Sequence, residues 1–174
     1  MTENKRKKRS SLRLIAICGI FSALVIIGTE LRIPTAIGHI NLGDAVILMA
    51  SYFIGPASFF PAAIGSALGD LIAGYPHYIV PSFVIKGLMG LISALIMSRS
   101  HVGSIKGFIV RLAGALSAEL IMIGGYFAFE SLMYGMESAL GSVVFNLIQA
   151  VVAIVCAMPL TYVIKTKKIT GRLK

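Results

Sequence analysis

The sequence has few charged residues, and acidic ones are the scarcest of these. Only 13% of its 174 residues are charged, with 7 Asp and Glu against 16 Lys and Arg. A soluble domain has about 25% charged residues, and a chain of this length has too small an interior to bury the 57% that are hydrophobic. Together with a mean hydropathy of +0.89, these values exclude a soluble globular protein and predict an integral membrane protein.

Tryptophan is absent, cysteine is rare, and the common catalytic motifs are missing. Cys18 and Cys156 lie in separate apolar segments, so we expect two buried free thiols, neither a disulfide nor a metal site. The sequence contains no G-x-x-x-x-G-K-[ST], no G-x-S-x-G and no H-E-x-x-H. We therefore expect no ATP hydrolysis by this chain, no metal and no cofactor, and an enzyme is disfavoured.

Basic residues gather at the two ends of the chain. KRKKR occupies residues 5–9, and KTKK occupies residues 165–168. Clusters of this kind beside apolar segments are typical of cytoplasmic anchors against anionic lipid headgroups, although a solvated basic tail gives the same pattern. We expect basic cytoplasmic tails at 1–11 and 165–174 around a single domain that covers 1–174. Because the charge is confined to the ends, we expect membrane lipid and not nucleic acid as a partner.

Six apolar segments follow one another, at roughly 12–29, 42–54, 57–73, 78–97, 107–129 and 138–164. The second is short for a span of about 20 residues, so fusion with the third segment and a re-entrant segment are alternatives. Because both ends are basic, both should be cytoplasmic, which requires an even number of spans. The sequence predicts an all-α, multi-pass protein of the bacterial plasma membrane, with six transmembrane helices and both termini cytoplasmic.

Polar residues form one stripe on each of the last three predicted spans. Residues at spacings of three, four, seven or eight share a helix face. The stripes are Tyr78, Ser82 and Lys86; Glu119, Tyr126 and Glu130; and Ser138, Ser142, Asn146 and Gln149. The six-span topology places them at similar depth, with Lys86 about 12 Å below the outer membrane surface. Convergence of the stripes predicts an outward-facing cavity for a small polar molecule that contains a ring.

Charges inside a membrane usually pair with one another or serve function, so two interpretations of Lys86 stay open. It contacts substrate, or it forms a buried pair with Glu119 or Asp44 that holds helices in register. Asp44 is also interpreted as a capping carboxylate in the first turn of a helix. The loop at 30–41 is long and apolar enough to fold over the cavity as a lid. The predicted substrate site comprises Lys86, Glu119, Asn146, Gln149, Tyr78, Ser82, Tyr126 and His39. We expect Lys86→Met and Asn146→Ala to weaken ligand binding without unfolding the bundle.

Three runs, GHINLGDAVILMASYFIGP, AAIGSALGDLIAGY and PSFVIKGLMGLISALI, resemble the substrate-binding (S) components of energy-coupling factor (ECF) vitamin transporters, and more narrowly the riboflavin-type family. The similarity is close over 14–97 and holds only in pattern for the last two spans. It implies a six-helix subunit that binds a vitamin or precursor at the extracellular face. It also implies assembly with a transmembrane coupling subunit and two cytoplasmic ATPases, which agrees with the missing nucleotide-binding motif.

In this family, small residues of the first span in an A-x-x-x-A pattern meet the coupling subunit. The resemblance therefore implies partner docking through Gly19, Ala23, Ala16 and Ser22, with Gly19 in place of the usual alanine. For the other glycines, packing within the bundle is the favoured interpretation. The resemblance to this family does not determine which vitamin the chain binds. The absence of Trp and the modest stripes favour a single-ring compound such as hydroxymethylpyrimidine or a pyridoxine-like molecule, with pantothenate and riboflavin as alternatives.

Two other functions are alternatives to this one. The first is a membrane-embedded enzyme that acts on a lipid or prenyl substrate and uses the intramembrane charges as catalysts; the sequence lacks the aspartate-rich metal motif that such an enzyme needs. The second is a purely structural bundle of small residues that recruits partners.

Overall fold

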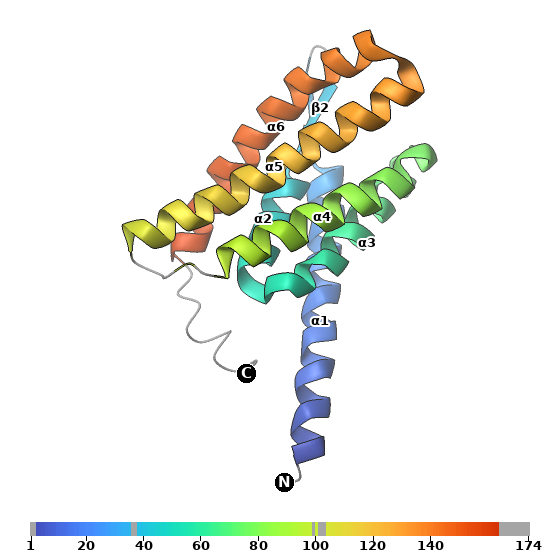
Figure 1. Ribbon diagram of the computed structural model, residues 1–174. Coiled ribbons are helices and arrows are strands. Elements are labelled where there is room, and N and C mark those ends of the chain that lie inside the picture. The colour runs from blue at the N-terminus through green and yellow to red at the C-terminus, as the bar shows by residue number, and fades with distance from the viewer. Residues whose placement is uncertain (1–2, 36–37, 99, 101–103, 164–174) are drawn as a thin grey trace.

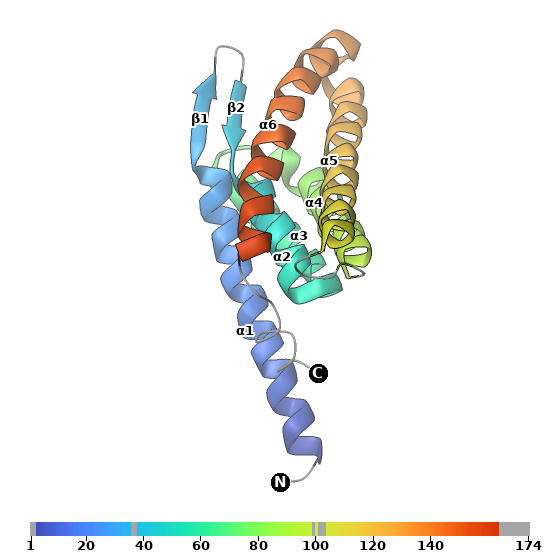
Figure 2. The same ribbon diagram turned by 90° about the vertical axis from the view of Figure 1, so that its left-hand side faces the viewer.

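The computed structural model describes residues 3–35, 38–98, 100 and 104–163, which form a bundle of helices with a β-hairpin at one end (Figure 1; Figure 2). The helices are α1 (Glu3–Glu30), α2 (Gly43–Ile54), α3 (Phe59–Ile72), α4 (Ile79–Met97), α5 (Ile105–Tyr134) and α6 (Met136–Val163). The strands are β1 (Arg32–Thr35) and β2 (Gly38–Asn41), and two short 3-10 helices are η1 (Gly55–Ser58) and η2 (Pro76–Tyr78). The prediction of a helical bundle is confirmed.

The connection between α1 and α2 was expected as a loop and instead contains an antiparallel hairpin. β1 pairs with β2 so that Arg32 faces Asn41 and Pro34 faces His39. The hairpin and the α5–α6 turn lie at the same end of the bundle (Figure 2), which is called the hairpin end below. Contacts of β2 with α6 fix the hairpin against the bundle.

The helix breaks occur close to where the sequence placed them. Gly55, Gly74 and Gly135 have φ values of 63°, 82° and 89°, a conformation that glycine adopts without the steric penalty of a Cβ. The helix break predicted at 130–137 is confined to Gly135 in the structure, because helix α5 continues through Glu130 to Tyr134. The last two helices are therefore longer than the apolar segments that predicted them.

In the part of the chain that the structure describes, five helical segments are long and apolar enough to cross a membrane. They are Ser10–Glu30, Gly43–Ile72, Pro76–Met97, Ile105–Tyr134 and Met136–Thr161. The second contains both α2 and α3, whose 12 and 14 residues extend about 18 and 21 Å, less than the hydrocarbon core of about 30 Å. A multi-pass helical protein is confirmed, while six spans and cytoplasmic termini remain predictions.

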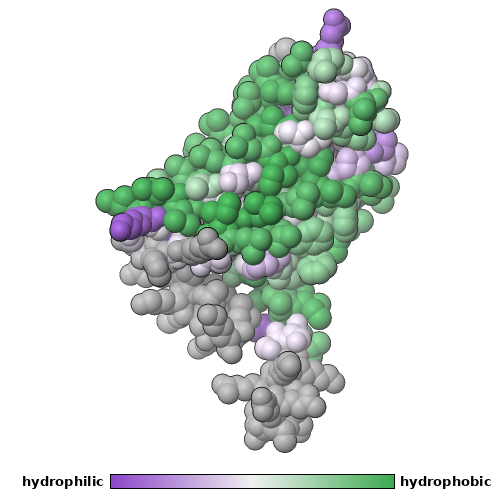
Figure 3. All heavy atoms as spheres, in the orientation of Figure 1, coloured by the Kyte–Doolittle hydropathy of each residue, from purple (hydrophilic) through white to green (hydrophobic). Residues whose placement is uncertain are grey.

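The structure describes the backbone of the first predicted basic tail from Glu3 onward and does not describe the second tail. Helix α1 begins at Glu3, so the run at 5–9 belongs to a helix that projects beyond the bundle, away from the hairpin end (Figure 1). The tail at 165–174 lies outside the described residues. The surface of the bundle is mainly hydrophobic, and hydrophilic residues gather near helix ends (Figure 3), as expected for a protein surrounded by lipid.

Glycine allows close helix packing, as expected for a bundle in lipid. A Cβ added at Gly65 of α3 would lie 2.7 Å from Cβ of Val25 and 2.8 Å from the carbonyl oxygen of Ser22, both in α1. A Cβ at Gly90 of α4 would lie 2.9 Å from the carbonyl oxygen of Ser58. The hydroxyl of Ser58 in turn donates to the carbonyl oxygen of Gly90 at 2.8 Å. These contacts hold α3 against α1 and η1 against α4.

Candidate functional site

A cavity of about 330 Å³ lies at the hairpin end, between the ends of the helices. Its lining residues come from α1, the hairpin, the α3–α4 connection and every later α-helix except α2: Thr29, Asn41, Ser66, Asp70, Tyr75, Tyr78, Lys86, Tyr126, Glu130, Ser142, Phe145, Asn146 and Gln149. Ligand cavities in proteins range from about 300 to 1,000 Å³, so this one is at the small end of that range. It suits a compact molecule better than an extended one.

The three predicted stripes converge on this cavity. Of the eight predicted site residues, five line it: Lys86, Asn146, Gln149, Tyr78 and Tyr126. Glu130 and Ser142, which belong to the same stripes, line it too, whereas Ser138 is exposed. Helical register on α4, α5 and α6 was therefore enough to find one wall of the cavity.

Three predicted site residues are not among the lining residues. Ser82 is buried behind Tyr126, and their hydroxyl groups are 2.7 Å apart. Glu119 is 2% exposed, and neither of its carboxylate oxygens has a hydrogen-bond partner within the described part of the chain. His39 lies in β2, and its side chain lies outside what the structure describes. Whether these residues contact substrate stays a prediction.

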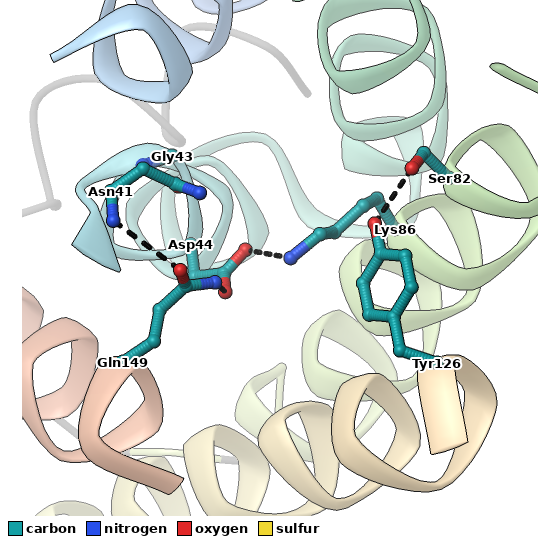
Figure 4. A network of polar contacts seen from close by, with 7 residues as sticks. All are labelled: Asn41, Gly43, Asp44, Ser82, Lys86, Tyr126 and Gln149. Carbon is teal, nitrogen blue, oxygen red and sulfur yellow. Dashed lines mark hydrogen bonds and ion pairs between the residues drawn. The ribbon is translucent and has the colours of Figure 1, made fainter. Parts of the chain in front are cut away.

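The buried partner of Lys86 is Asp44, the first charged residue of α2. Nζ of Lys86 lies 2.5 Å from Oδ1 of Asp44, and Nε2 of Gln149 donates to Oδ2 at 2.6 Å (Figure 4). The exposed fractions of Asp44, Lys86 and Gln149 are only 1%, 6% and 6%. Burial makes an unpaired charge costly, so Lys86 and Asp44 each need the other. Their network with Gln149 joins α2, α4 and α6 at the base of the cavity.

Asp44 lies in the first turn of α2, as expected, but its side chain bonds across the bundle instead of capping its own helix. Oδ1 of Asn41 accepts a hydrogen bond from the backbone N–H of Gly43 at 3.0 Å and so satisfies one donor of that first turn. The backbone N–H of Asn41 donates to Oε1 of Gln149 at 3.3 Å (Figure 4). The end of the hairpin is thereby tied to both α2 and α6.

Aromatic rings form the wall above the Lys86–Asp44 pair. Nζ of Lys86 lies 5.3 Å from the ring centre of Tyr126, close enough for a cation–π interaction. The ring of Tyr126 is 6.1 Å from that of Tyr78, which is 6.3 Å from that of Tyr75. The hydroxyl of Tyr78 donates to Oε1 of Glu130 at 3.0 Å. The cavity thus combines flat apolar faces with carboxylates, amides and hydroxyls, a lining suited to a polar ring.

The α3 wall of the cavity was missed by the sequence reasoning. Ser66 and Asp70 both line the cavity, and their spacing of four residues was a signal of a shared helix face. Thr29, Asn41 and Phe145 gave no such signal, because none of them belongs to a run of polar residues at helical spacing.

Helix α1 carries the residues predicted to dock a partner. Ala16, Gly19 and Ala23 are exposed, and Ser22 is half-buried. An added Cβ at Gly19 would meet no atom of the described chain within 4 Å. Gly19 and Ser22 also line an apolar groove with Leu14, Ile15, Cys18, Ala57, Phe60 and Ile64. These positions are accessible, and partner docking stays a prediction.

The two cysteines are free, as expected, but the prediction that both are buried is wrong. Cys18 is half-buried between α1 and η1, with Sγ 3.9 Å from the carbonyl oxygen of Ala57. Cys156 is exposed, as are its neighbour Val155 and Val151 one turn earlier. Its apolar setting reflects the lipid-facing surface of α6, not the bundle interior.

One curated relative is an uncharacterized protein in the gap 3' region from Pyrococcus woesei, 32% identical over 99 residues. That alignment covers 53% of this chain and 66% of the relative, just under two thirds of its length. A family model described as the S component of an ECF-type riboflavin transporter matches residues 9–166, nearly the whole chain. The match agrees with the apolar helices of a multi-pass cell-membrane protein. The chain therefore belongs to the ECF-type riboflavin transporter S-component family, whose members are vitamin-uptake subunits.

Proposed function

We propose that this chain captures a small water-soluble vitamin or precursor at the extracellular face and delivers it to an ATP-driven importer. The observation that carries the proposal is the cavity at the hairpin end, on which the polar stripes of α4, α5 and α6 converge. In the proposed assembly, a transmembrane coupling subunit and two cytoplasmic ATPases supply the driving force. The alternative of a membrane-embedded enzyme is not favoured by the family match.

In the proposed topology all six helices cross the membrane, with the hairpin end outside and both termini in the cytoplasm. Successive helices run in opposite directions (Figure 1; Figure 2). Glu130 and Glu137 lie at the hairpin end, whereas the basic run at 5–9 lies at the other, which agrees with the positive-inside rule. The segment that contains α2 and α3 is the most buried of the five apolar segments. Surrounding helices enclose α2, which has no exposed residue, whereas α3 keeps an exposed apolar face that includes Phe60 and Ile64.

The proposed ligand is a single-ring compound such as hydroxymethylpyrimidine or a pyridoxine-like molecule. The volume of about 330 Å³ and the tyrosine faces support a compact ring, and the amides of Asn146 and Gln149 offer it donors and acceptors. Pantothenate and riboflavin are the alternatives within the same function.

Asn146→Ala is expected to weaken ligand binding about 3- to 10-fold, because it removes a neutral hydrogen-bonding group from the cavity wall. Ligand affinity would be measured by calorimetry on the purified protein. Ser138→Ala is the matched control, since Ser138 belongs to the same stripe but is exposed and does not line the cavity. Equal affinity in the wild type and Asn146→Ala would remove Asn146 from the site.

Purification from a membrane lysate tests the proposed assembly. A tagged chain should retain a coupling protein and two ATPases. Isolation without these partners, or turnover of a lipid substrate by the chain alone, would contradict the proposal. A triple substitution of Ala16, Gly19 and Ala23 to leucine should abolish retention if this face of α1 is the docking surface, because these exposed positions would then be too bulky for close helix approach.

A further inference from the structure

Among the lining residues that the structure describes, acidic side chains outnumber basic ones. Its charged lining residues are Asp70, Lys86 and Glu130. The ammonium of Lys86 is already paired with Asp44, which is not itself among the lining residues. Once that pair is counted as neutral, the carboxylate of Glu130 remains in the described lining for a ligand to contact.

One carboxylate oxygen of Glu130 has no hydrogen-bond donor among the residues that the structure describes. The residue is 8% exposed, and its Oε1 accepts the hydroxyl proton of Tyr78. Its Oε2 is buried and receives no hydrogen bond from any residue that the structure describes. A buried carboxylate oxygen without a donor is unfavourable, and the favourable partner is a positively charged N–H group.

The tyrosine wall favours the same kind of ligand. The rings of Tyr75, Tyr78 and Tyr126 succeed one another with centroids 6.3 and 6.1 Å apart, and all three residues line the cavity together with Glu130. The face of an aromatic ring is electron-rich and attracts a cation within about 6 Å. A ring that carries a positive charge gains both from stacking on these faces and from the carboxylate beside them.

We infer that the ligand is a small aromatic compound with a positively charged nitrogen, whose N–H group donates to Oε2 of Glu130 while its ring lies against Tyr78 and Tyr126. This inference rests on the proposed function and narrows its ligand class. A carboxylate ligand would place a second negative charge beside the buried carboxylate of Glu130, and the two charges would repel each other. An aminomethylpyridine, whose alkyl amine is an ammonium at neutral pH, fits this chemistry, and an acid such as pantothenate does not.

Three probes that share one pyridine ring test the inference: pyridoxamine with its ammonium group, neutral pyridoxine, and anionic 4-pyridoxate. Their affinities for the purified full-length protein would be measured by calorimetry at neutral pH. We expect pyridoxamine to bind at least about tenfold more tightly than pyridoxine, and 4-pyridoxate to bind most weakly. Equal affinities, the reverse order, or no binding of pyridoxamine would overturn the inference.

The substitution Glu130→Gln tests whether the carboxylate of Glu130 causes the preference for pyridoxamine. This isosteric change should reduce the preference for pyridoxamine over pyridoxine by about tenfold, while pyridoxine binding reports that the cavity is still folded. Glu137→Gln is the matched control, because Glu137 is an exposed acid at the start of α6 and does not line the cavity. An unchanged preference in Glu130→Gln would also overturn the inference. Tight binding of pantothenate by a chain that retains its ATPases would overturn only the ligand class, whereas loss of those partners would overturn the proposed function.

Discussion

Lys86→Met is expected to destabilise the folded bundle by about 3–5 kcal/mol, because it leaves the carboxylate of Asp44 buried without its cation. Asp44 is 1% exposed, and of its two hydrogen bonds to described side chains it would keep the one from Gln149. The sequence alone predicted weaker ligand binding without unfolding, and the ion pair changes that expectation. The measurement is the midpoint of thermal unfolding in detergent, followed by circular dichroism.

A double-mutant cycle separates the ion pair from other effects of the substitution. Asp44→Asn alone leaves the ammonium of Lys86 buried, so it should also destabilise the bundle. The double variant Asp44→Asn/Lys86→Met removes both charges and should recover most of the lost stability. Lys106→Met serves as a control, since Lys106 is exposed at the start of α5. Strictly additive effects of the two single substitutions would contradict a stabilising pair.

Gly65→Ala is expected to destabilise the bundle by about 3 kcal/mol, near the upper end of the range for overpacking. The new methyl group would lie 2.7 Å from Cβ of Val25 and 2.8 Å from the carbonyl oxygen of Ser22. Because one of these atoms belongs to the backbone of α1, no side-chain rotation relieves the clash, and the two helices must separate. Thermal unfolding measures the effect.

Gly124→Ala provides a matched control for Gly65→Ala. Gly124 lies within α5 and is exposed, and an added Cβ there would meet no atom of the described residues within 4 Å. Alanine also has the higher helix propensity, so this variant should be as stable as the wild type or slightly more so. If both substitutions changed the unfolding midpoint equally, close packing of α1 on α3 would not explain the glycine at position 65.

The stripes on α4, α5 and α6 were predictable because helical register fixes which residues share a face. Register does not reveal which residue on another helix a side chain meets. Lys86 and Asp44 are 42 positions apart, and Glu119 was an equally good candidate partner in the sequence. The structure resolves that choice, because α2 brings the carboxylate of Asp44 to the ammonium, whereas that of Glu119 bonds to no described residue.

Other features depend on packing between elements, which the spacing of apolar residues in the sequence does not predict. The hairpin β1–β2 is a short element whose pairing is stabilised by contacts with α6. Arg111 of α5 is fully buried, and its guanidinium nitrogens have no hydrogen-bond partner in the described part of the chain. Its charge lies 5.6 Å from the ring centre of Tyr52, a cation–π contact between helices that no local sequence pattern marks.

The most direct test of the binding role is mass spectrometry of the small molecule retained by the protein after purification under mild conditions. The wild type would be compared with Asn146→Trp, in which the large indole fills part of the cavity of about 330 Å³. Our account predicts that a single-ring compound with a basic nitrogen is released from the wild type and is absent from the variant. Release of a different kind of compound from the wild type alone would contradict the ligand class, whereas release of equal amounts from both proteins would contradict the assignment of this cavity as the vitamin site.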